Sequence, residues 1–251
     1  METKLNVVLI AQTKLNKDFA KWVYAHTYEQ GGGGGFFADA SDTQCVALTA
    51  IRTCYSANKP TEIIIKEGKR YFERKATDGE GGTEADRLIR HIMRSKHTST
   101  IEHISYTFAV EGLSRSALAQ LTRHRFFSFS VQSQRYCKFG SGDRSGGFDY
   151  VKPTTVEEDA EQVFFETMAD LQSAYDRLRK AGVPAEDARF VLPNAAACNL
   201  VLSGNLRSIL DFYSKRKPGR GAQWEIADLA ERMREEIVVE DPWTAKFFEE
   251  A

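Results

Sequence analysis

Hydrophobic residues that alternate with polar ones mark the expected strands of this chain. Residues 5–13, LNVVLIAQT, form a short apolar run rich in β-branched side chains, which favours a strand. Residues 199–204, NLVLSG, also suggest a strand. Residues 103–112 alternate with the period of a half-buried strand. The apolar positions of this third run are Ile104, Tyr106, Phe108 and Val110. A sheet is therefore expected.

Apolar residues spaced three or four apart predict helices between and after these strands. The expected helices cover residues 84–95, 114–125, 155–181, 184–192, 205–216 and 222–237. Ser114 or Ser116 can cap the second helix, and Pro184 suits the first turn of the fourth. Ser99 and Glu102 have the spacing of a capping box. Because helices and strands interleave without a regular βαβ repeat, the predicted fold class is α+β, with a mixed or antiparallel sheet packed by helices.

Two stretches interrupt this pattern. The glycine run 31–35 lacks the GK[ST] ending of a phosphate-binding loop, so residues 29–37 are expected to be a flexible insertion. A second flexible insertion is expected at residues 61–85, because residues 66–84 are charged and glycine-rich and resemble a mobile surface loop. The 251 residues, 42% of them hydrophobic, suffice for one sizeable core, so residues 1–251 are expected to form a single domain.

Charge and composition exclude several classes of protein. The 34 basic and 35 acidic residues nearly cancel, so the whole chain has no charge excess that would attract a nucleic acid polymer or an anionic membrane. No run approaches the roughly 18 apolar residues of a membrane span, and the first residues lack the features of a signal peptide, which indicates a cytoplasmic protein. The cysteines form no CxxC pair, which argues against a zinc knuckle or a disulfide framework. They are Cys45, Cys54, Cys137 and Cys198.

The densest polar segment is RHRFFSFSVQSQRY, from Arg123 to Tyr136, with three arginines, one histidine and three serines in fourteen residues. Arginine presents a rigid fork of donors that matches phosphate and carboxylate geometry. Phe126, Phe127 and Phe129 lie among the polar residues and tend to pull the segment against a core or an interface. The segment therefore predicts a pocket for a multiply charged small anion. A solvated basic face is the simpler alternative.

This segment resembles the signature of the flavin-dependent thymidylate synthases, in which RHR is followed after seven residues by Ser. Here residues 123–125 are followed by FFSFSVQ and then by Ser133. The extended form of the signature adds a Ser three residues after RHR, matched by Ser128, and ends in Ser-x-Arg-Tyr, matched by residues 133–136.

Segments on both sides of the signature resemble the same family. HTSTIEH, residues 97–103, is similar to its HxSxxEH segment, and CYSANKP, from Cys54, is similar to an early CYxSxxKP-like stretch. ARFVLPN, VLSGNLRSILDFYSKR and AQWEI resemble its closing motifs in the right order. The resemblance covers residues 44–60 and 86–230 and leaves the glycine run and the second insertion unexplained.

The resemblance implies a set of residues for the substrate dUMP and another for the cofactor FAD. The implied dUMP set is Gln120, Arg123, Ser133, Gln134, Arg135, Arg189 and Arg216. The implied FAD set is Ser99, Glu102, Arg123, His124, Arg125, Asn205, Arg207 and Asp211. Catalytic roles are implied for Arg216, His97 and Ser133, and no metal is implied.

Four members of these sets carry specific expectations. Arg135 and Arg189 are the expected partners of the dUMP phosphate. Arg216 matches the arginine with which the family favours the ionised uracil ring, and a fixed guanidinium stabilises charge that develops there. Asp211 departs from the pattern, because relatives commonly carry a neutral or basic FAD contact at its place.

The reaction that the resemblance implies is the reductive methylation of dUMP to dTMP by an FAD-dependent methyltransferase, a flavoprotein of nucleotide biosynthesis. Methylenetetrahydrofolate supplies the carbon, and NADPH reduces FAD, which supplies the hydride. The protein contributes orientation and electrostatics while the cofactor carries the difficult chemistry. The family also implies a homotetramer with shared active sites, whose other partners are small molecules.

Three alternatives to this interpretation rest on the basic segment, on the histidines and on a cysteine. Basic residues among aromatics also suit an RNA-binding module, although the balanced charge speaks against it. His91, His97 and His103 could be ligands of a metal enzyme, but spacings of six residues do not put three ligands on one helical face. Cys137 lies nearest the basic cluster and is the candidate for a thiolate mechanism. It lacks the Pro-Cys-Gln setting of the classical thymidylate synthases and is interpreted as incidental.

Overall fold

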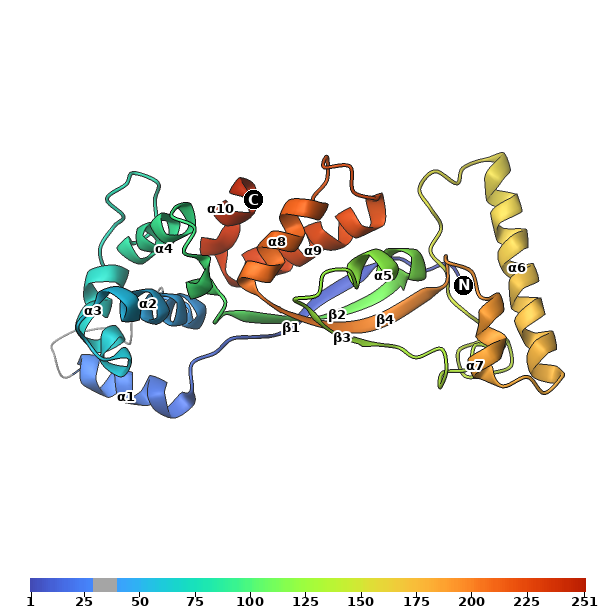
Figure 1. Cartoon of the computed structure of the whole chain (residues 1–251), viewed down its shortest axis with the longest axis horizontal. Coiled ribbons are helices and arrows are strands. Elements are labelled where there is room, and N and C mark those ends of the chain that lie inside the picture. Colours follow the sequence, from blue (N-terminus) through green and yellow to red (C-terminus); the bar gives the residue numbers. More distant parts are fainter. Residues whose placement is uncertain (29–39) are drawn as a thin grey trace. The chain divides into compact units, whose positions relative to one another are not determined.

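The computed structural model describes residues 1–28 and 40–251 (Figure 1). The predicted insertion at 29–37 lies outside the described residues. The chain divides into two compact units, each built from three separate segments. Unit 1 comprises Met1–Val8, Phe108–Ser203 and Arg216–Arg232, and unit 2 comprises Leu9–Thr107, Gly204–Lys215 and Met233–Ala251. The expectation of a single domain stays a prediction.

In the described residues, four strands form one sheet in the order β1-β2-β4-β3. The strands are β1 (Asn6–Gln12), β2 (Ser105–Ser114), β3 (Ser128–Val131) and β4 (Ala197–Asn205). β1, β2 and β4 confirm the three expected strands, and the four alternating apolar residues expected in and beside β2 are all fully buried. β3 pairs antiparallel with β4, so that Ser128 lies opposite Ser203. The α+β class is therefore confirmed, and the arginine-rich segment supplies a strand that the sequence pattern did not predict.

The helices of unit 1 follow the predicted pattern with shorter bounds. They are α5 (Arg115–Leu121), α6 (Asp159–Lys180), α7 (Ala185–Ala188) and the 3-10 turn Arg189–Val191, together with the first part of α9 (Trp224–Glu240). Ser114 caps α5 by accepting a hydrogen bond from the Ala117 amide at 3.0 Å. The expected helix 114–125 ends at Leu121, before the three residues RHR. The expected helix 184–192 is divided into α7 and the 3-10 turn.

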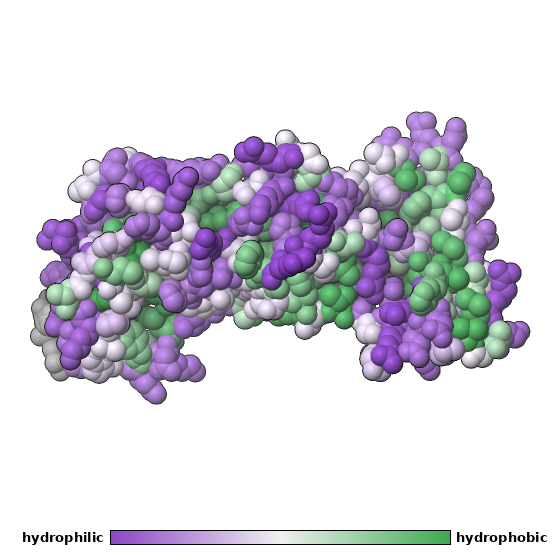
Figure 2. Space-filling model, viewed as in Figure 1, coloured by the Kyte–Doolittle hydropathy of each residue, from purple (hydrophilic) through white to green (hydrophobic). Residues whose placement is uncertain are grey.

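One hydrophobic cluster of unit 1 gathers around α6, which lies beside α7 (Figure 1). Its buried members are Phe139, Phe148, Met168, Tyr175, Ala188 and Ala196. Of the 22 residues of α6, only Met168 and Tyr175 are buried. Val163 of the same helix remains 63% exposed, and Figure 2 shows hydrophobic side chains gathered over this helix. α6 thus keeps part of its apolar stripe on the surface of the single chain.

Unit 2 is mainly helical. Its helices are α1 (Lys17–Tyr28), α2 (Asp42–Tyr55), α3 (Ile63–Phe72), α4 (Glu84–Arg94), α8 (Leu206–Arg216, without its last residue), the end of α9 and α10 (Ala245–Glu250). The described part of this unit also contains the 3-10 turns Pro60–Glu62, Thr98–Ile101 and Pro242–Thr244. α2, α3 and α4 pack together (Figure 1), and their shared core includes Leu48, Ile64, Tyr71 and Ala85.

The prediction of a mobile loop at residues 61–85 is wrong for most of the first half of this range. Residues 63–72 form the helix α3. Ile63 and Ile64 are fully buried, and Tyr71 and Phe72 are at most 8% exposed. These two pairs stand about two helical turns apart and so share one face. The charged window that begins at Lys66 hides this face, because two of its apolar members lie before the window. Buried side chains hold the segment against α2 and α4.

All four cysteines are free thiols. Cys45 and Cys198 are buried, and burial raises the pKa of the Cys45 thiol to about 12 and that of Cys198 to about 11. Cys54 is exposed, and Cys137 is half-buried. Among the described helices, none combines the length and the apolar character needed to cross a membrane.

Candidate active site

The RHR residues of unit 1 continue from the C-terminal end of α5. The Arg123 amide donates to the Gln120 carbonyl at 3.3 Å, and the His124 amide donates to the Leu121 carbonyl at 3.0 Å. These turns fix the backbone of the three residues against the helix. Arg123 and Arg125 are exposed, and neither guanidinium has an ion pair with any carboxylate in the described part of the chain. Both charges are therefore available to an anionic ligand.

The other end of α5 is held by a buried carboxylate. Glu225 of α9 is 3% exposed and accepts hydrogen bonds from the amide and the hydroxyl of Ser114, each at 2.6 Å. Burial raises the pKa of Glu225, and the hydrogen bonds from Ser114 oppose that shift. The same Ser114 hydroxyl accepts from the Ala117 amide, so the carboxylate and the helix cap form one network. This network positions the helix from which the RHR residues follow.

Arg216 is placed against the middle residue of RHR. Its Nε–H donates to Nε2 of His124 at 3.1 Å, so this ring nitrogen is an acceptor. Both residues belong to unit 1. The hydrogen bond uses one donor of the guanidinium and leaves its two NH2 groups for other acceptors.

Ser133, Gln134 and Arg135 form a turn that follows β3. The Cys137 amide donates to the Ser133 carbonyl at 2.9 Å, and the Arg135 amide donates to Oγ of Ser133 at 3.2 Å. Ser133 therefore keeps its hydroxyl proton for a further acceptor. Arg135 is 58% exposed at its side chain, and its guanidinium lies 5.6 Å from the centre of the Tyr136 ring.

Arg135 and Arg189, the two expected phosphate partners, are brought together by Glu186 of α7. The Nε–H of Arg135 donates to the Glu186 carboxylate at 2.6 Å, and the Nε–H of Arg189 donates to the Glu186 backbone carbonyl at 2.9 Å. Two arginines that are far apart in the sequence thus share one anchoring residue. Nothing in the residue pattern singled out Glu186, which is one of two acids in a helix of four residues.

In unit 2, Ser99 and Glu102 do not form the predicted capping box. Ser99 lies inside the 3-10 turn Thr98–Ile101, and Glu102 follows the turn, with its amide donating to the Ser99 carbonyl at 3.2 Å. The Glu102 carboxylate is instead ion-paired with Arg207 of α8. A guanidinium competes better for the carboxylate than a backbone amide does, so the ion pair replaces the cap. Two residues of the expected FAD set are therefore in direct contact.

His97 is oriented by a residue that the sequence analysis did not single out. The hydroxyl of Tyr55 lies 2.7 Å from Nδ1 of His97, which leaves Nε2 of the ring for another partner. Both side chains are exposed. Tyr55 belongs to the CYSANKP segment, so the motif contained the signal, but no chemistry was assigned to its tyrosine.

Asn205 and Asp211 complete the expected FAD set. Asn205 accepts from the Ser208 amide at 2.9 Å and so caps α8. Asp211 forms an ion pair with Lys215 one helical turn later, at 2.7 Å. The unexpected acid at position 211 is therefore accompanied by a cation on the same helix. Arg207 and Asp211 line a cavity of about 330 Å3 within unit 2.

The expected site residues fall in both units. Unit 1 contains Gln120, Arg123, His124, Arg125, Ser133, Gln134, Arg135, Arg189 and Arg216, and unit 2 contains His97, Ser99, Glu102, Asn205, Arg207 and Asp211. Within the described part of the chain, no group of three His, Cys, Asp or Glu side chains could hold a metal ion.

Comparison with known proteins identifies related sequences over most of the chain. The thymidylate synthase complementing protein family matches residues 37–243. A flavin-dependent thymidylate synthase of Geobacter sulfurreducens is 48% identical over 194 residues, which are 76% of this chain and 76% of that protein. A flavin-dependent thymidylate synthase of Haloarcula marismortui is 33% identical over 208 residues, with 73% of this chain and 84% of that protein covered.

Solved structures have the same fold. A UMP/dUMP methylase, PolB of Streptomyces cacaoi bound with 5-Br dUMP, matches with a TM-score of 0.68 and 22% identity. The match covers 98% of this chain and 95% of the methylase chain. Thymidylate synthase X of Helicobacter pylori, solved with FAD and dUMP, has a TM-score of 0.64 and 22% identity, covering 98% of both chains. At this level of identity, the likeness establishes the fold.

Proposed function

Since the chain belongs to the thymidylate synthase complementing protein family, that of the flavin-dependent thymidylate synthases, we propose that its two sets of residues bind dUMP and FAD for one reaction. That reaction is the conversion of dUMP to dTMP, with FAD as the cofactor. The observation that carries the assignment of residues is the pairing of Arg135 and Arg189 on Glu186.

Arg135 and Arg189 bind the phosphate of dUMP in this proposal. Each uses its Nε–H on Glu186 and keeps two NH2 groups, which suit the oxygens of a phosphate. Ser133 and Gln134, in the same turn as Arg135, and Gln120 and Arg123, at the end of α5, contact the rest of the nucleotide.

Arg216 acts on the uracil ring. Its Nε–H is engaged with His124, so its two NH2 groups are presented in a fixed orientation. A fixed guanidinium stabilises negative charge that develops on the ring without reorganising during the reaction. Ser133 can donate its hydroxyl proton to a ring oxygen, because its Oγ accepts only from the Arg135 amide.

The described residues fit FAD, which needs cations for its two phosphates and apolar surface for its flat rings. Arg123 and Arg125 have no carboxylate partner within the described residues, and Arg207 lines a cavity that also has apolar side chains in its wall. Ser99, Glu102, His124, Asn205 and Asp211 are the further proposed contacts. His97, oriented by Tyr55, can hold or release a proton at Nε2. Bound FAD supplies the hydride chemistry that no side chain can supply.

We also propose the co-substrates and the assembly. Methylenetetrahydrofolate is the carbon donor, NADPH is the reductant, and the enzyme works in the cytoplasm, where such metabolites are used. A homotetramer is supported by two apolar surfaces that a single chain leaves uncovered. One is the apolar side of α6 (Figure 2). The other consists of aromatic side chains next in sequence to the proposed binding arginines: Phe126, Tyr136 and Phe190, each at least 80% exposed. Light scattering on the purified protein would give the mass of the assembly, and a monomeric mass would contradict the tetramer.

The experiment that tests the function is an omission assay. The purified chain is expected to acquire a flavin absorption spectrum with FAD and to form dTMP from dUMP, methylenetetrahydrofolate and NADPH. Leaving out FAD or either co-substrate should abolish dTMP formation, and NADH in place of NADPH tests the reductant. A protein that binds no FAD in a titration and forms no dTMP would refute the proposal.

A further inference from the structure

The smaller cavity of unit 2 has a wall to which no function is assigned. Its lining comes from the ends of α4 and α10, the 3-10 turn Thr98–Ile101 and α8. Its larger apolar members are Met93, Ile101, Leu210 and Phe247, its charged side chains are those of Arg94, Arg207, Asp211 and Glu250, and Thr98, Ser214 and Ala251 complete the lining. Arg207 and Asp211 are proposed FAD contacts. Phe247 and Glu250 belong to α10, which no motif of the sequence includes.

This lining has the chemistry of a site for a flat ring attached to an anionic chain. Apolar side chains suit the faces of an aromatic ring, and the two arginines, each ion-paired with a carboxylate, can share their remaining N–H donors with phosphate groups. The volume of about 330 Å3 lies at the lower end of the range for ligand sites, roughly 300–1,000 Å3. It is therefore large enough for one ring system of FAD and too small for the whole molecule.

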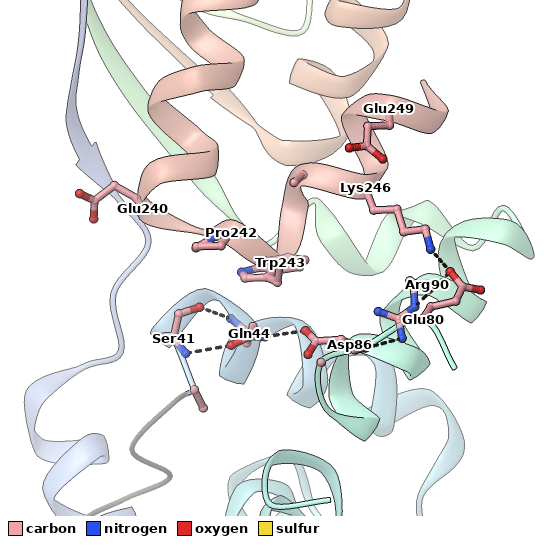
Figure 3. Close-up of a pocket in the computed structure, with 14 residues that line it drawn as sticks. Ser41, Gln44, Glu80, Asp86, Arg90, Glu240, Pro242, Trp243, Lys246 and Glu249 are labelled. Atoms are coloured by element: carbon pink, nitrogen blue, oxygen red, sulfur yellow. Dashed lines mark hydrogen bonds and ion pairs between the residues drawn. The ribbon is translucent and has the colours of Figure 1, made fainter. Parts of the chain in front are cut away.

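α10 is held in place by four charged residues, Glu80, Arg94, Lys246 and Glu250, which we call the carboxylate clasp. Arg94 donates to both oxygens of Glu80, at 2.7 and 2.9 Å, and to Glu250 at 3.2 Å. Lys246 of α10 forms an ion pair with the same Glu80 (Figure 3). Glu80 thus joins the loop before α4 both to Arg94 and to α10.

Glu80 itself is not part of the smaller cavity. It lines a larger cavity of about 830 Å3, together with Lys246 and Glu249 of α10 (Figure 3). α10 therefore contributes Lys246 and Glu249 to one cavity and Phe247 and Glu250 to the other. Hydrogen bonds from Arg94 and then Lys246 lower the pKa of Glu80 to about 2, so the clasp stays charged at neutral pH.

Aromatic contacts complete the attachment of α10. Phe248 packs edge-on against Tyr213 of α8, with ring centres 5.2 Å apart, and Phe247 packs edge-on against Trp243 at 5.9 Å. These contacts hold the helix as a whole. The charged clasp acts on its two ends, through Lys246 and Glu250.

We propose that α10 forms one wall of the FAD site, with Phe247 against a ring system of FAD and Glu80 as the positioning residue that holds this wall and Arg94 in place. The inference rests on the proposed function, since it concerns the same cofactor. It extends the site to a helix that lies outside the recognised motifs.

Two variants separate this role from general stability. Glu80→Gln removes the charge at the centre of the clasp without touching the smaller cavity, and Phe247→Leu changes the wall while keeping an apolar side chain. Each is expected to weaken FAD binding on the order of three- to tenfold, because several partly exposed ion pairs or one ring contact are lost. Two matched controls should change FAD affinity less than about twofold. They are Glu249→Gln, on α10, and Glu62→Gln, which removes an exposed ion pair of unit 2.

The measurement is a titration of the full-length protein with FAD, followed by flavin fluorescence, with dUMP affinity and circular dichroism recorded for every variant. Weaker FAD binding by both test variants, with unchanged dUMP affinity and fold, supports the proposal. Repeating the titration with FMN identifies the ring: FMN affinity falls too if the cavity takes the flavin ring and is unchanged if it takes the adenine.

Two results would overturn the inference. If the unaltered protein binds FAD and both test variants bind it equally well, α10 is not part of the site and the proposed function is untouched. If the unaltered protein binds no FAD at all, the proposed function fails and the inference fails with it.

Discussion

The arginines that we assign to ligands differ between the two units in whether a carboxylate is already paired with them. In unit 1, Arg123 and Arg125 have no carboxylate partner in the described part of the chain, and Arg189 and Arg216 donate to a backbone carbonyl and a histidine ring. In unit 2, Arg207 is paired with Glu102 and Arg94 with Glu80 and Glu250.

This difference sets how each set of residues can receive an anion. A guanidinium without a carboxylate partner gains an anionic ligand without losing an ion pair. A paired guanidinium must exchange or share its carboxylate, so part of the gain is cancelled. We therefore expect the arginines of unit 1 to contribute more to anion affinity than those of unit 2. Arg135, whose Nε–H is paired with Glu186, is the exception within unit 1.

The largest expected effect comes from removing a phosphate partner. Arg135→Ala and Arg189→Ala should each weaken dUMP binding about 10- to 100-fold, the scale of a charge-assisted hydrogen bond. Binding of deoxyuridine, which has no phosphate, should hardly change. Calorimetry with both ligands measures the two affinities.

Arg144→Ala is the matched control for these variants, because Arg144 is an exposed arginine of unit 1 outside the proposed site. It should bind dUMP like the unaltered protein. Equal losses of dUMP and deoxyuridine in the test variants would show that Arg135 and Arg189 act through folding.

The second effect concerns the buried carboxylate that holds α5. Burial raises the pKa of Glu225 in the folded state. The folded protein therefore retains the proton of the Glu225 carboxyl group at pH values where the unfolded chain has released it. The free energy of unfolding should therefore fall as the pH rises from the ordinary glutamate pKa of 4.5 through the raised value. The slope for one proton is at most about 1.4 kcal/mol per pH unit.

Glu225→Gln should remove this contribution. Denaturant titrations of both proteins at several pH values measure the difference in unfolding free energy. The expected result is that the variant gains stability relative to the unaltered protein as the pH rises through this window. A difference that stays constant with pH would show that Glu225 does not titrate on unfolding.

A smaller effect is expected at Glu186, and it tests the comparison between paired and unpaired arginines directly. If the phosphate must share Arg135 with Glu186, Glu186→Gln should tighten dUMP binding about two- to fivefold, the scale of an exposed ion pair. Asp187→Asn, a neighbouring acid on the same short helix, is the control. Weaker binding by Glu186→Gln would instead mean that the carboxylate positions Arg135 for the nucleotide.

The smallest effect is expected at the cysteines. Changing Cys54 and Cys137 to Ser should leave FAD-dependent dTMP formation within about twofold, because the proposed reaction uses no thiolate. Changing all four cysteines should also leave the reaction, with some loss of stability where Cys45 and Cys198 are buried. A folded, FAD-loaded variant that forms no dTMP until Cys137 is restored would establish a thiolate mechanism.

The sequence predicted the parts of the fold in which one residue pattern decides the structure. The alternation through Ile104, Tyr106, Phe108 and Val110 predicted β2, because over residues 104–111 the buried positions alternate with less buried ones. The helix α3 was missed, since its charged middle masks two short apolar pairs at its ends. Its helical state depends on packing against α2 and α4, which no local pattern contains.

For the candidate site too, the sequence predicted what a local motif contains and not what depends on tertiary contacts. The RHR signature pointed to the arginines, but their partners depend on contacts across long separations in the chain. Glu186 and Tyr55 could not be found from their own residue types, because a lone acid or tyrosine is usually only a surface residue. The spacing of Ser99 and Glu102 suggested a cap, and the tertiary ion pair with Arg207 overrode it.

The different surroundings of the four thiols also make the chain suited to selective chemical labelling. At neutral pH a maleimide requires an accessible thiolate, and the buried, high-pKa thiols of Cys45 and Cys198 offer neither access nor charge. With Cys137 changed to Ser, a dye should attach at Cys54 alone. Cys54 directly precedes Tyr55, the partner of His97. The fluorescence of the attached dye would therefore report changes beside a proposed catalytic side chain, and no cysteine has to be introduced for the attachment.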